Sequence, residues 1–370
     1  MAIVDQIEWC ETPLVAPTRG TLVEQEIRRQ LGLSLTSIPY LAPVPWVAWS
    51  FATKIQPVAH IPSRLADLIT LVVSMENSCR HCYGATRSIL RLTGYSQNRI
   101  SELEEDFFHA KLDERSKAVL DFSRKCARAD PRPDARDLEV LERVGLSRVA
   151  VAEVAYVATN TCYSNRLATL LAIPPDGIED QDNSLLTRLF RPLVAIGFRK
   201  FLNRARKRNI RKYASAPGNP QGVPFGGRLV NALQGSPTAD VLQSILNGCW
   251  HSPHTATRTK ALAFAIIART LNCPVCTAEA SQLLKSEGLL QEDIDHLQTY
   301  LSSDALNGFE SSFIHFARDT VNYQVPDIQF VARRFLTGMG KEEIIELCGL
   351  VALANWVARL SIILEQSETA

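Results

Sequence analysis

The chain carries one short motif twice, and this repetition restricts its fold more than any other feature. Cys79-Arg80-His81-Cys82 and Cys273-Pro274-Val275-Cys276 are CxxC motifs with an offset of 194 residues. Further pairs coincide at this offset, namely His60 with His254, Arg64 with Arg258, Leu90 with Leu284 and Gly94 with Gly288. Matching positions around a repeated motif indicate an internal duplication. We therefore expect two similar structural units.

The sequence around each motif has the spacing of helices. Residues 63–74 repeat apolar side chains at helical intervals before the first motif, and residues 257–268 do so before the second. Each CxxC therefore begins a new helix, and Gly94 or Gly288 stands where a glycine cap would end it. Matching helices follow at 114–129 and 308–323, and then at 149–171 and 342–364. Because strand signals are scarce, we predict an all-α fold of two tandem units packed about a pseudo-twofold axis.

Length and composition agree with two soluble units. The chain has 370 residues, which is enough for two cores, and its 46% hydrophobic and 21% charged content is typical of globular proteins. A net charge of +1 gives no reason to expect a nucleic-acid partner. Early acidic residues argue against a signal peptide, and we expect no membrane-spanning helix. The nine cysteines lack the spacing of a secreted disulfide scaffold, so we expect a reducing cytoplasm.

We predict a first domain over residues 1–178, a basic linker over 179–227 and a second domain over 228–370. Residues 188–212 hold ten Lys or Arg, with apolar residues interspersed. Such a segment can be a connecting helix that packs its apolar side on both domains. It can also be a basic amphipathic helix on an anionic membrane surface. Residues 216–222 have the composition of a turn-rich linker.

Each CxxC is a candidate redox site. A helix N-terminus stabilises a thiolate, so one cysteine can attack a peroxide or disulfide and the second can resolve the product. Three groups can assist in the first copy: His81 inside the motif, Asp67 twelve residues before Cys79, and His60 nineteen before it. An apolar setting would raise the pKa of the Asp67 carboxyl and suit it to a proton relay. An ion pair with Arg64, one turn back, is the alternative use of Asp67.

The order of acidic residue, eleven residues, CxxC and capped helix resembles the alkylhydroperoxidase D-like branch of the carboxymuconolactone decarboxylase family. The later stretch Asn165-Arg166-Leu167-Ala168 and the earlier Ile38-Pro39-Tyr40-Leu41-Ala42-Pro43 are also similar to segments of its peroxidase-related members. The resemblance covers roughly residues 20–175 and 228–365. It implies an all-helical domain, a tendency to form homo-oligomers, and reduction of hydroperoxides through the dithiol.

By this resemblance Cys82 would attack the hydroperoxide and Cys79 would resolve the product, with Asp67 replacing the usual glutamate. His81 matches a histidine that some members carry just before the second cysteine. One departure concerns the relay histidine expected four residues after the second cysteine, which is Thr86 in the first copy and Ala280 in the second. The acidic position of the second copy is Ala261.

Several alternatives stay open for these residues. Cys79 and Cys82 can be redox-active, buried and inert, or part of a metal site, although a zinc site needs four ligands and the motif with His81 supplies three. We expect no metal and no bound organic cofactor. His60, and its counterpart His254, can lie near the site or can cap and pack a helix start.

The second copy is less well equipped. Cys273 and Cys276 can be redox-active or a structural remnant, since Pro274 removes an amide that could face a thiolate. Glu279, three residues after Cys276, can substitute as a base or be a solvated first-turn residue.

The sequence thus favours a cytoplasmic thiol-dependent peroxidase or disulfide oxidoreductase. Its partners would be a hydroperoxide and an external dithiol or thioredoxin-like reductant. The first alternative is a decarboxylase or hydrolase-type enzyme of the same fold, acting on a small acidic metabolite with Arg64, His60 and Asp67. The second is a non-catalytic, membrane-peripheral scaffold that uses residues 188–212.

Overall fold

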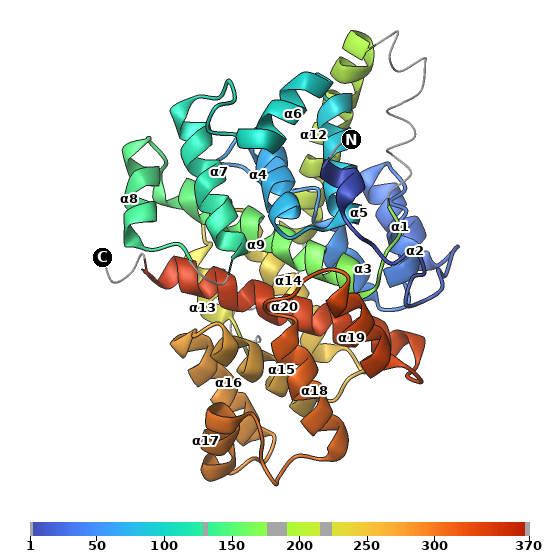
Figure 1. Ribbon diagram of the computed structural model, residues 1–370, viewed down its shortest axis with the longest axis vertical. Coiled ribbons are helices and arrows are strands. Elements are labelled where there is room, and N and C mark those ends of the chain that lie inside the picture. Colours follow the sequence, from blue (N-terminus) through green and yellow to red (C-terminus); the bar gives the residue numbers. More distant parts are fainter. Residues whose placement is uncertain (1–2, 129–131, 176–190, 215–223, 367–370) are drawn as a thin grey trace.

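The computed structural model is all-helical (Figure 1). It describes residues 3–128, 132–175, 191–214 and 224–366, and within these ranges it contains no strand. The predicted all-α class is therefore confirmed. The predicted boundary at residues 178–179, the turn-rich segment 216–222 and the first three residues of the basic segment 188–212 lie outside the described residues.

The helices follow one another along the chain with short connections. The first part contains η1 (Ile3–Gln6), α1 (Leu22–Leu31), α2 (Ile38–Leu41), α3 (Pro45–Ala52), α4 (Ser63–Glu76), α5 (Arg80–Leu92), α6 (Gln97–Asp106), α7 (Glu114–Ala127), α8 (Ala135–Arg143) and α9 (Arg148–Leu170). The basic segment contains α12 (Arg191–Ala214). The last part contains α13 (Gly227–Ala232), α14 (Thr238–His251), α15 (Thr257–Thr270), α16 (Pro274–Ser286), α17 (Gln291–Tyr300), α18 (Gly308–Asp319), α19 (Asp327–Leu336) and α20 (Lys341–Gln366).

Each CxxC motif directly follows a turn with the same unusual backbone conformation. Helix α4 is followed by Ser78 with φ 49°, and α15 is followed by Asn272 with φ 50°. This left-handed conformation is uncommon for residues other than glycine. The amide of the next residue, Cys79 or Cys273, donates to the carbonyl five residues back at 3.0 and 2.9 Å. Each first cysteine is then the N-cap of the following helix, α5 or α16.

The predicted glycine turns are present as well. Gly94 has φ 103° and Gly288 has φ 91°, which is backbone that glycine adopts without steric cost. They lie just after α5 and α16, as the sequence predicted. The helices that follow the CxxC motifs therefore end in the same manner.

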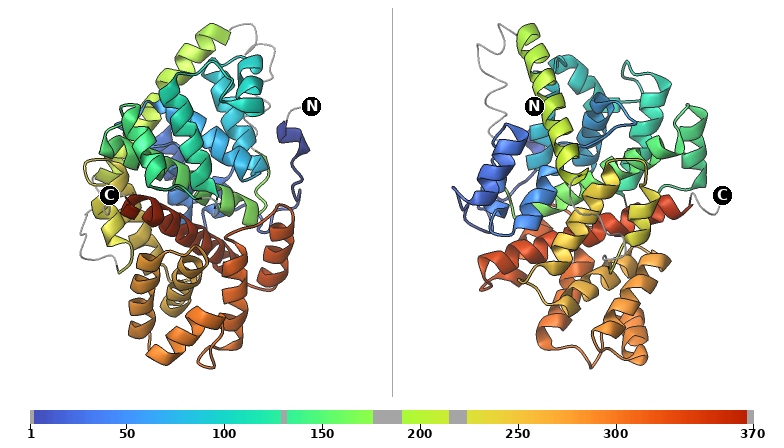
Figure 2. Two further views of the ribbon diagram at one scale, coloured as in Figure 1. Left: turned by 60° about the vertical axis from the view of Figure 1, so that its left-hand side comes forward. Right: turned by 180° about the vertical axis from the view of Figure 1, so that it is seen from behind.

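Two long helices form the centre of the molecule. Helices α9 and α20 pack side by side, with α4, α5 and α7 against α9 and with α15 and α16 against α20 (Figures 1 and 2). By length and composition α20 could cross a membrane, but 94% of its apolar window is buried inside the protein. Its apolar character is accounted for by its place in the core.

Two buried arginines join the halves across this centre. Arg166 of α9 donates from Nε and Nη2 to the carbonyls of Thr320 and Val321, at 3.1 and 2.9 Å. Arg359 of α20 donates from Nη1 to the carbonyls of residues 127 and 128, at 3.0 and 2.8 Å. These carbonyls lie at the C-terminal ends of α18 and α7, where helices leave acceptors unpaired. Each half thus caps a helix of the other.

Helix α3 approaches the second half without space for an extra methyl group. A Cβ atom at Gly248 of α14 would lie 2.7 Å from Cβ of Trp46, and one at Gly349 of α20 would lie 2.7 Å from Cγ2 of Val47. Real Cβ atoms do not approach other atoms so closely. Glycine at these two positions lets α3 pack against both helices.

This close contact predicts the effect of two matched substitutions. Gly248→Ala should lower the free energy of unfolding by about 1–3 kcal/mol, because α3 and α14 must separate. Gly197→Ala in α12 should leave it unchanged or raise it by up to about 1 kcal/mol, because nothing lies within 4 Å of the added methyl and alanine favours the helix. Urea unfolding followed by far-UV circular dichroism measures both. Equal effects of the two variants would contradict the packing described for α3.

Candidate functional site

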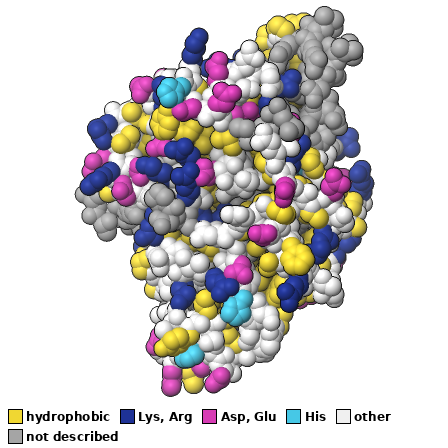
Figure 3. Space-filling model, viewed as in Figure 1, with side chains coloured by type: hydrophobic (Ala, Val, Ile, Leu, Met, Phe, Trp, Pro, Cys, Tyr) yellow, Lys and Arg dark blue, Asp and Glu magenta, His cyan; other side chains and the backbone are white. Residues whose placement is uncertain are grey.

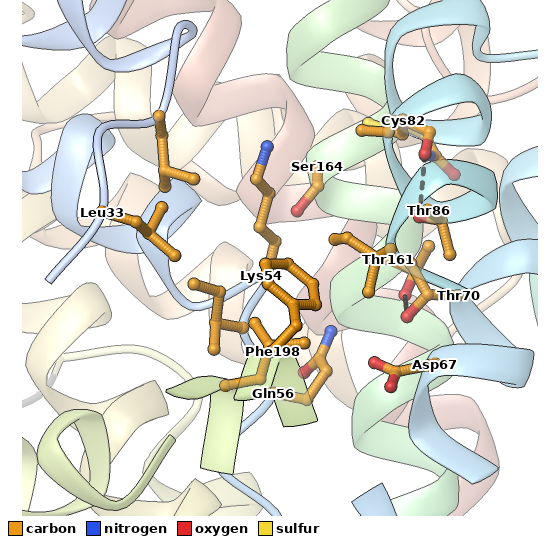
Figure 4. Close-up of a pocket in the computed structure, with 16 residues that line it drawn as sticks. Leu33, Lys54, Gln56, Asp67, Thr70, Cys82, Thr86, Thr161, Ser164 and Phe198 are labelled. Carbon is orange, nitrogen blue, oxygen red and sulfur yellow. Dashed lines mark hydrogen bonds between the residues drawn. The ribbon is translucent and has the colours of Figure 1, made fainter. Parts of the chain in front are cut away.

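A cavity of about 80 Å³ lies beside the first CxxC motif (Figure 4). Helices α4, α5, α9 and α12 and the segment around α3 form its wall. Its apolar lining is Leu33, Leu35, Ile55, Ala85, Ile89, Phe198 and Leu202. Its polar lining is Lys54, Gln56, Asp67, Thr70, Cys82, Thr86, Thr161, Ser164 and Asn165.

The two cysteines differ in their relation to this cavity. Neither cysteine is in a disulfide, and Sγ of Cys79 accepts a hydrogen bond from the amide of Cys82 at 3.4 Å. Cys82 forms part of the cavity wall, whereas Cys79 lies behind it with no exposed surface. Burial, followed by the neighbouring Cys82, raises the pKa of the Cys79 thiol well above its ordinary value. Cys79 therefore keeps its proton, and Cys82 is the thiol that a molecule in the cavity meets.

Asp67 reaches the same cavity from α4 and is mostly buried. Its Oδ1 pairs with Nη2 of Arg206, which comes from α12. Burial raises the pKa of the Asp67 carboxyl to about 6, and the Arg206 charge opposes part of this rise. The prediction that Asp67 is buried with a raised pKa agrees with this geometry. The alternative partner was wrong, because the structure pairs Asp67 with Arg206 while Nε of Arg64 donates to Oη of Tyr95 at 2.7 Å.

Threonine hydroxyls lie between Cys82 and Asp67 along one wall (Figure 4). Thr86 occupies the position of the expected relay histidine, and its Oγ1 donates to the Cys82 carbonyl at 2.8 Å. Oγ1 of Thr161 lies 3.5 Å from Oγ1 of Thr70, which itself donates to the Ala66 carbonyl at 3.0 Å. A threonine hydroxyl does not titrate near neutral pH, so Thr86 cannot act as the base. Asp67 is the acid–base group that this wall supplies.

The two histidines of the first copy lie away from the cavity. His81 is fully buried, and its Nδ1 donates to the Pro174 carbonyl at 2.6 Å, so it ties α5 to the segment after α9. His60 is exposed, and its Nε2 bonds to the Gly235 carbonyl at 3.0 Å. Its backbone amide donates to Oε2 of Glu153 at 2.7 Å. The structure gives both rings contacts that hold segments together.

The cysteines of the second CxxC motif lie in the hydrophobic core. Cys273 and Cys276 are both buried. The pKa of the Cys276 thiol is raised well above its ordinary value, mainly by the neighbouring Cys273 and then by burial. Oε2 of Glu279 accepts from the Gly226 amide at 3.3 Å. His254 lines a different groove, with Trp46 and Trp49.

The difference extends to six polar positions of the wall, on the helices that correspond in sequence to α15, α16 and α20. At the offset of 194 residues, Asp67, Thr70 and Thr86 correspond to Ala261, Phe264 and Ala280. The last helix pair, 149–171 and 342–364, has an offset of 193 residues, and there Thr161, Ser164 and Asn165 correspond to Ala354, Val357 and Ala358. All six are buried and apolar. Phe264 packs on Phe225 with ring centroids 4.2 Å apart.

Helix α12 forms one side of the cavity wall. This role of the basic segment was not predicted from the sequence. Phe198 and Leu202 form part of the wall, and Arg206 pairs with Asp67. The helix lies against α1, α5 and α14, as the view from behind in Figure 2 shows. These contacts agree with a connecting helix that packs on both domains.

The membrane prediction stays a prediction. The outer side of α12 exposes Leu193 and Ile196 and then the bases Arg199, Lys200, Arg204, Lys207 and Arg208. On the face drawn in Figure 3, basic and acidic side chains are interspersed.

Within the described ranges, no three or more His, Cys, Asp and Glu side chains come together in a way that could hold a metal ion. The ionisable groups that line the cavity are the Cys82 thiol, the Asp67 carboxyl and the Lys54 ammonium, and the Arg206 guanidinium pairs with Asp67. No family model, no curated protein and no solved structure matches the chain.

The raised pKa of Asp67 predicts a dependence of stability on pH. A carboxyl whose pKa is higher in the folded state binds its proton more tightly there, so stability falls as pH rises from about 4 to about 6. Relative to Asp67→Asn, the wild type should lose on the order of 3 kcal/mol of unfolding free energy over this range. Urea unfolding at a series of pH values measures the difference. The exposed control Asp304→Asn should track the wild type, and a flat difference for Asp67→Asn would contradict the raised pKa.

Proposed function

We propose that this protein is a thiol-dependent peroxidase that reduces hydroperoxides through Cys79 and Cys82. One observation carries the proposal: Cys82, in the first turn of α5, faces a small cavity that it shares with a mostly buried carboxyl whose pKa is about 6. A second thiol lies directly behind it, at the N-cap of the same helix. An attacking thiol, a proton acceptor and a resolving thiol are the three parts that this reaction needs.

The reaction can be written with these groups and water. Asp67 accepts the proton of Cys82 by way of water in the cavity that both residues line, and the thiolate attacks the terminal oxygen of the hydroperoxide. The O–O bond breaks, Cys82 becomes a sulfenic acid, and Asp67 returns the proton to the leaving alkoxide, which departs as an alcohol. Cys79 then attacks the sulfur of Cys82. An S–S bond forms, the S–O bond breaks, and hydroxide leaves with the Cys79 proton as water.

The fully buried position of Cys79 suits the resolving role. Its raised pKa keeps it protonated while Cys82 reacts, so the two thiols do not compete for the peroxide. An external dithiol, such as a thioredoxin-like protein, would reduce the disulfide by thiol–disulfide exchange. This cycle requires no bound organic cofactor and suits a reducing cytoplasm, where we also expect the chain to form homo-oligomers.

We also propose that the chain arose by duplication and that its halves, 1–178 and 228–370, pack about a pseudo-twofold axis with 179–227 between them. The reciprocal contacts of Arg166 and Arg359 support this arrangement, because each reaches the equivalent helix end of the other half. The matching left-handed residues Ser78 and Asn272 support it as well. The apolar second copy would then serve as a structural partner.

The first test of the peroxidase function is the thiols themselves. One equivalent of hydrogen peroxide should convert Cys79 and Cys82 into a disulfide, which peptide mass spectrometry detects. Cys82→Ser should abolish peroxide consumption, because it removes the attacking sulfur. Cys79→Ser should allow one turnover and leave a sulfenic acid at Cys82 that dimedone traps.

The second copy provides the matched control. Cys276→Ser should retain at least about half of the wild-type rate if that copy is structural. Peroxide consumption that continues at the wild-type rate in Cys82→Ser would refute the assignment of the site.

The second test concerns the role of Asp67. If Asp67 is the base, kcat/KM for hydrogen peroxide should rise with pH through about 6, the pKa of its carboxyl. Asp67→Asn should lose this limb and should be slower by about 100-fold or more above pH 7. Stopped-flow oxidation between pH 4.5 and 8 measures the profile. A profile with the same limb in Asp67→Asn would assign the proton transfer to another group.

A further inference from the structure

A second, outer groove adjoins the thiol cavity. It has a volume of about 310 Å³, and Asp67 and Leu202 line both spaces. The rest of its wall comes from the start of α4, the end of α5 and α12, with Pro62, Ser63, Arg64, Thr93, Arg199, Asn203 and Arg206. A molecule in the groove therefore lies against the same carboxyl and the same leucine as a molecule beside Cys82.

The groove is strongly basic. Three arginines, Arg64, Arg199 and Arg206, line it with a single acid, Asp67, which is already paired with Arg206. Within the described ranges, no acidic side chain pairs with Arg64 or Arg199. Nε of Arg64 donates to the Tyr95 hydroxyl at 2.7 Å, and its guanidinium carbon lies 4.2 Å from the centre of that ring.

Arg199 is also held in place by a neutral partner. Nε of Arg199 donates to the Thr93 carbonyl at 2.7 Å. Both guanidinium groups are therefore fixed through Nε by uncharged groups, and this leaves their charge uncompensated. Fixed arginines without acidic partners are suited to bind carboxylate or phosphate oxygens.

Two further observations point to an anion in this groove. Helix α4 begins at Ser63, its N-cap Pro62 makes no side-chain cap, and both residues line the groove, so the positive end of the helix dipole lies at its wall. In addition, Nε of Arg206 is buried and makes no hydrogen bond to the described part of the chain. The Arg206 side chain is 9% exposed and lines the groove. A buried donor of this kind is costly unless a ligand or water satisfies it.

We propose that the groove binds the anionic head, a carboxylate or a phosphate, of a hydroperoxide whose reactive end enters the thiol cavity. This inference rests on the proposed peroxidase function and names its substrate class. The inner cavity has room for only two or three water-sized groups and has a largely apolar lining. It therefore suits the hydroperoxide and its adjoining carbons, while the larger basic groove takes the head.

Binding tests the groove without any turnover. The full-length Cys82→Ser variant is titrated calorimetrically with octanoate, octyl phosphate and octanol. At least one anion should bind roughly tenfold more tightly than octanol, and the tighter of the two identifies the head group. Arg199→Gln should remove most of this preference. Lys200→Gln, which removes the same charge from the next residue of α12, outside the lining of the groove, should retain it.

Equal affinity for the anions and octanol would overturn the proposal, and so would equal losses in Arg199→Gln and Lys200→Gln. Because Arg199 is exposed, its substitution should not unfold the chain, and Arg64→Gln provides a second variant. Binding without peroxide consumption would refute the proposed function and leave the anion site intact. Peroxide consumption without anion preference would refute the anion site alone.

Kinetics gives the corresponding measurement for turnover. The ratio of kcat/KM for 8-hydroperoxyoctanoate to that for its methyl ester should be roughly tenfold in the wild type. It should approach one in Arg199→Gln and stay at the wild-type value in Lys200→Gln. A wild-type ratio near one would contradict the assignment.

Discussion

The two buried arginines that cross between α9 and α20 are the contact on which the rest of the structure depends. Each places a cation in the core, where burial, helped by the charge of Arg166, lowers the pKa of Arg359 to about 9. The guanidinium groups are stabilised there by the carbonyls at the ends of α7 and α18, which carry the negative ends of the helix dipoles. Removing either arginine would leave these buried acceptors unpaired. The position of α7, and of α4 packed against it, therefore depends on the other half of the molecule.

Helix α4 transmits this constraint to the site. It carries Asp67 on its cavity side and ends at Ser78, whose left-handed conformation turns the chain into the N-cap position of Cys79. Helix α12 then covers the cavity and brings Arg206 to Asp67. Burial alone would raise the pKa of this carboxyl further, and the Arg206 charge holds it at about 6. A group near this pKa can accept and return a proton at neutral pH, which neither an exposed aspartate nor an unpaired buried one does well.

The parts of this structure that the sequence predicted are those set by local patterns. Apolar spacing predicted the helices, the position of Gly94 predicted the end of α5, and the apolar setting of Asp67 predicted its burial. Arg206 lies 139 residues from Asp67 along the chain, so this ion pair could not be predicted from local spacing. Local spacing favoured Arg64, which lies one helical turn from Asp67. His60 illustrates the same limit. Its recurrence as His254 shows only that a histidine suits this loop, and its contact with Gly235 depends on how the halves pack.

The two copies also show why a cavity and a stable core are competing uses of the same positions. In the first copy Thr70 leaves space beside Cys82, and the polar wall around it must be satisfied by hydrogen bonds. At the equivalent position Phe264 packs on Phe225, and a phenyl ring occupies volume that a threonine leaves open. The apolar copy gains buried surface and loses the groups that could move a proton. Because the arginines join the two halves, the apolar packing of the second half also supports the first half, whose wall is partly polar. One filled and one open site is therefore a consistent outcome for a chain whose halves share a core.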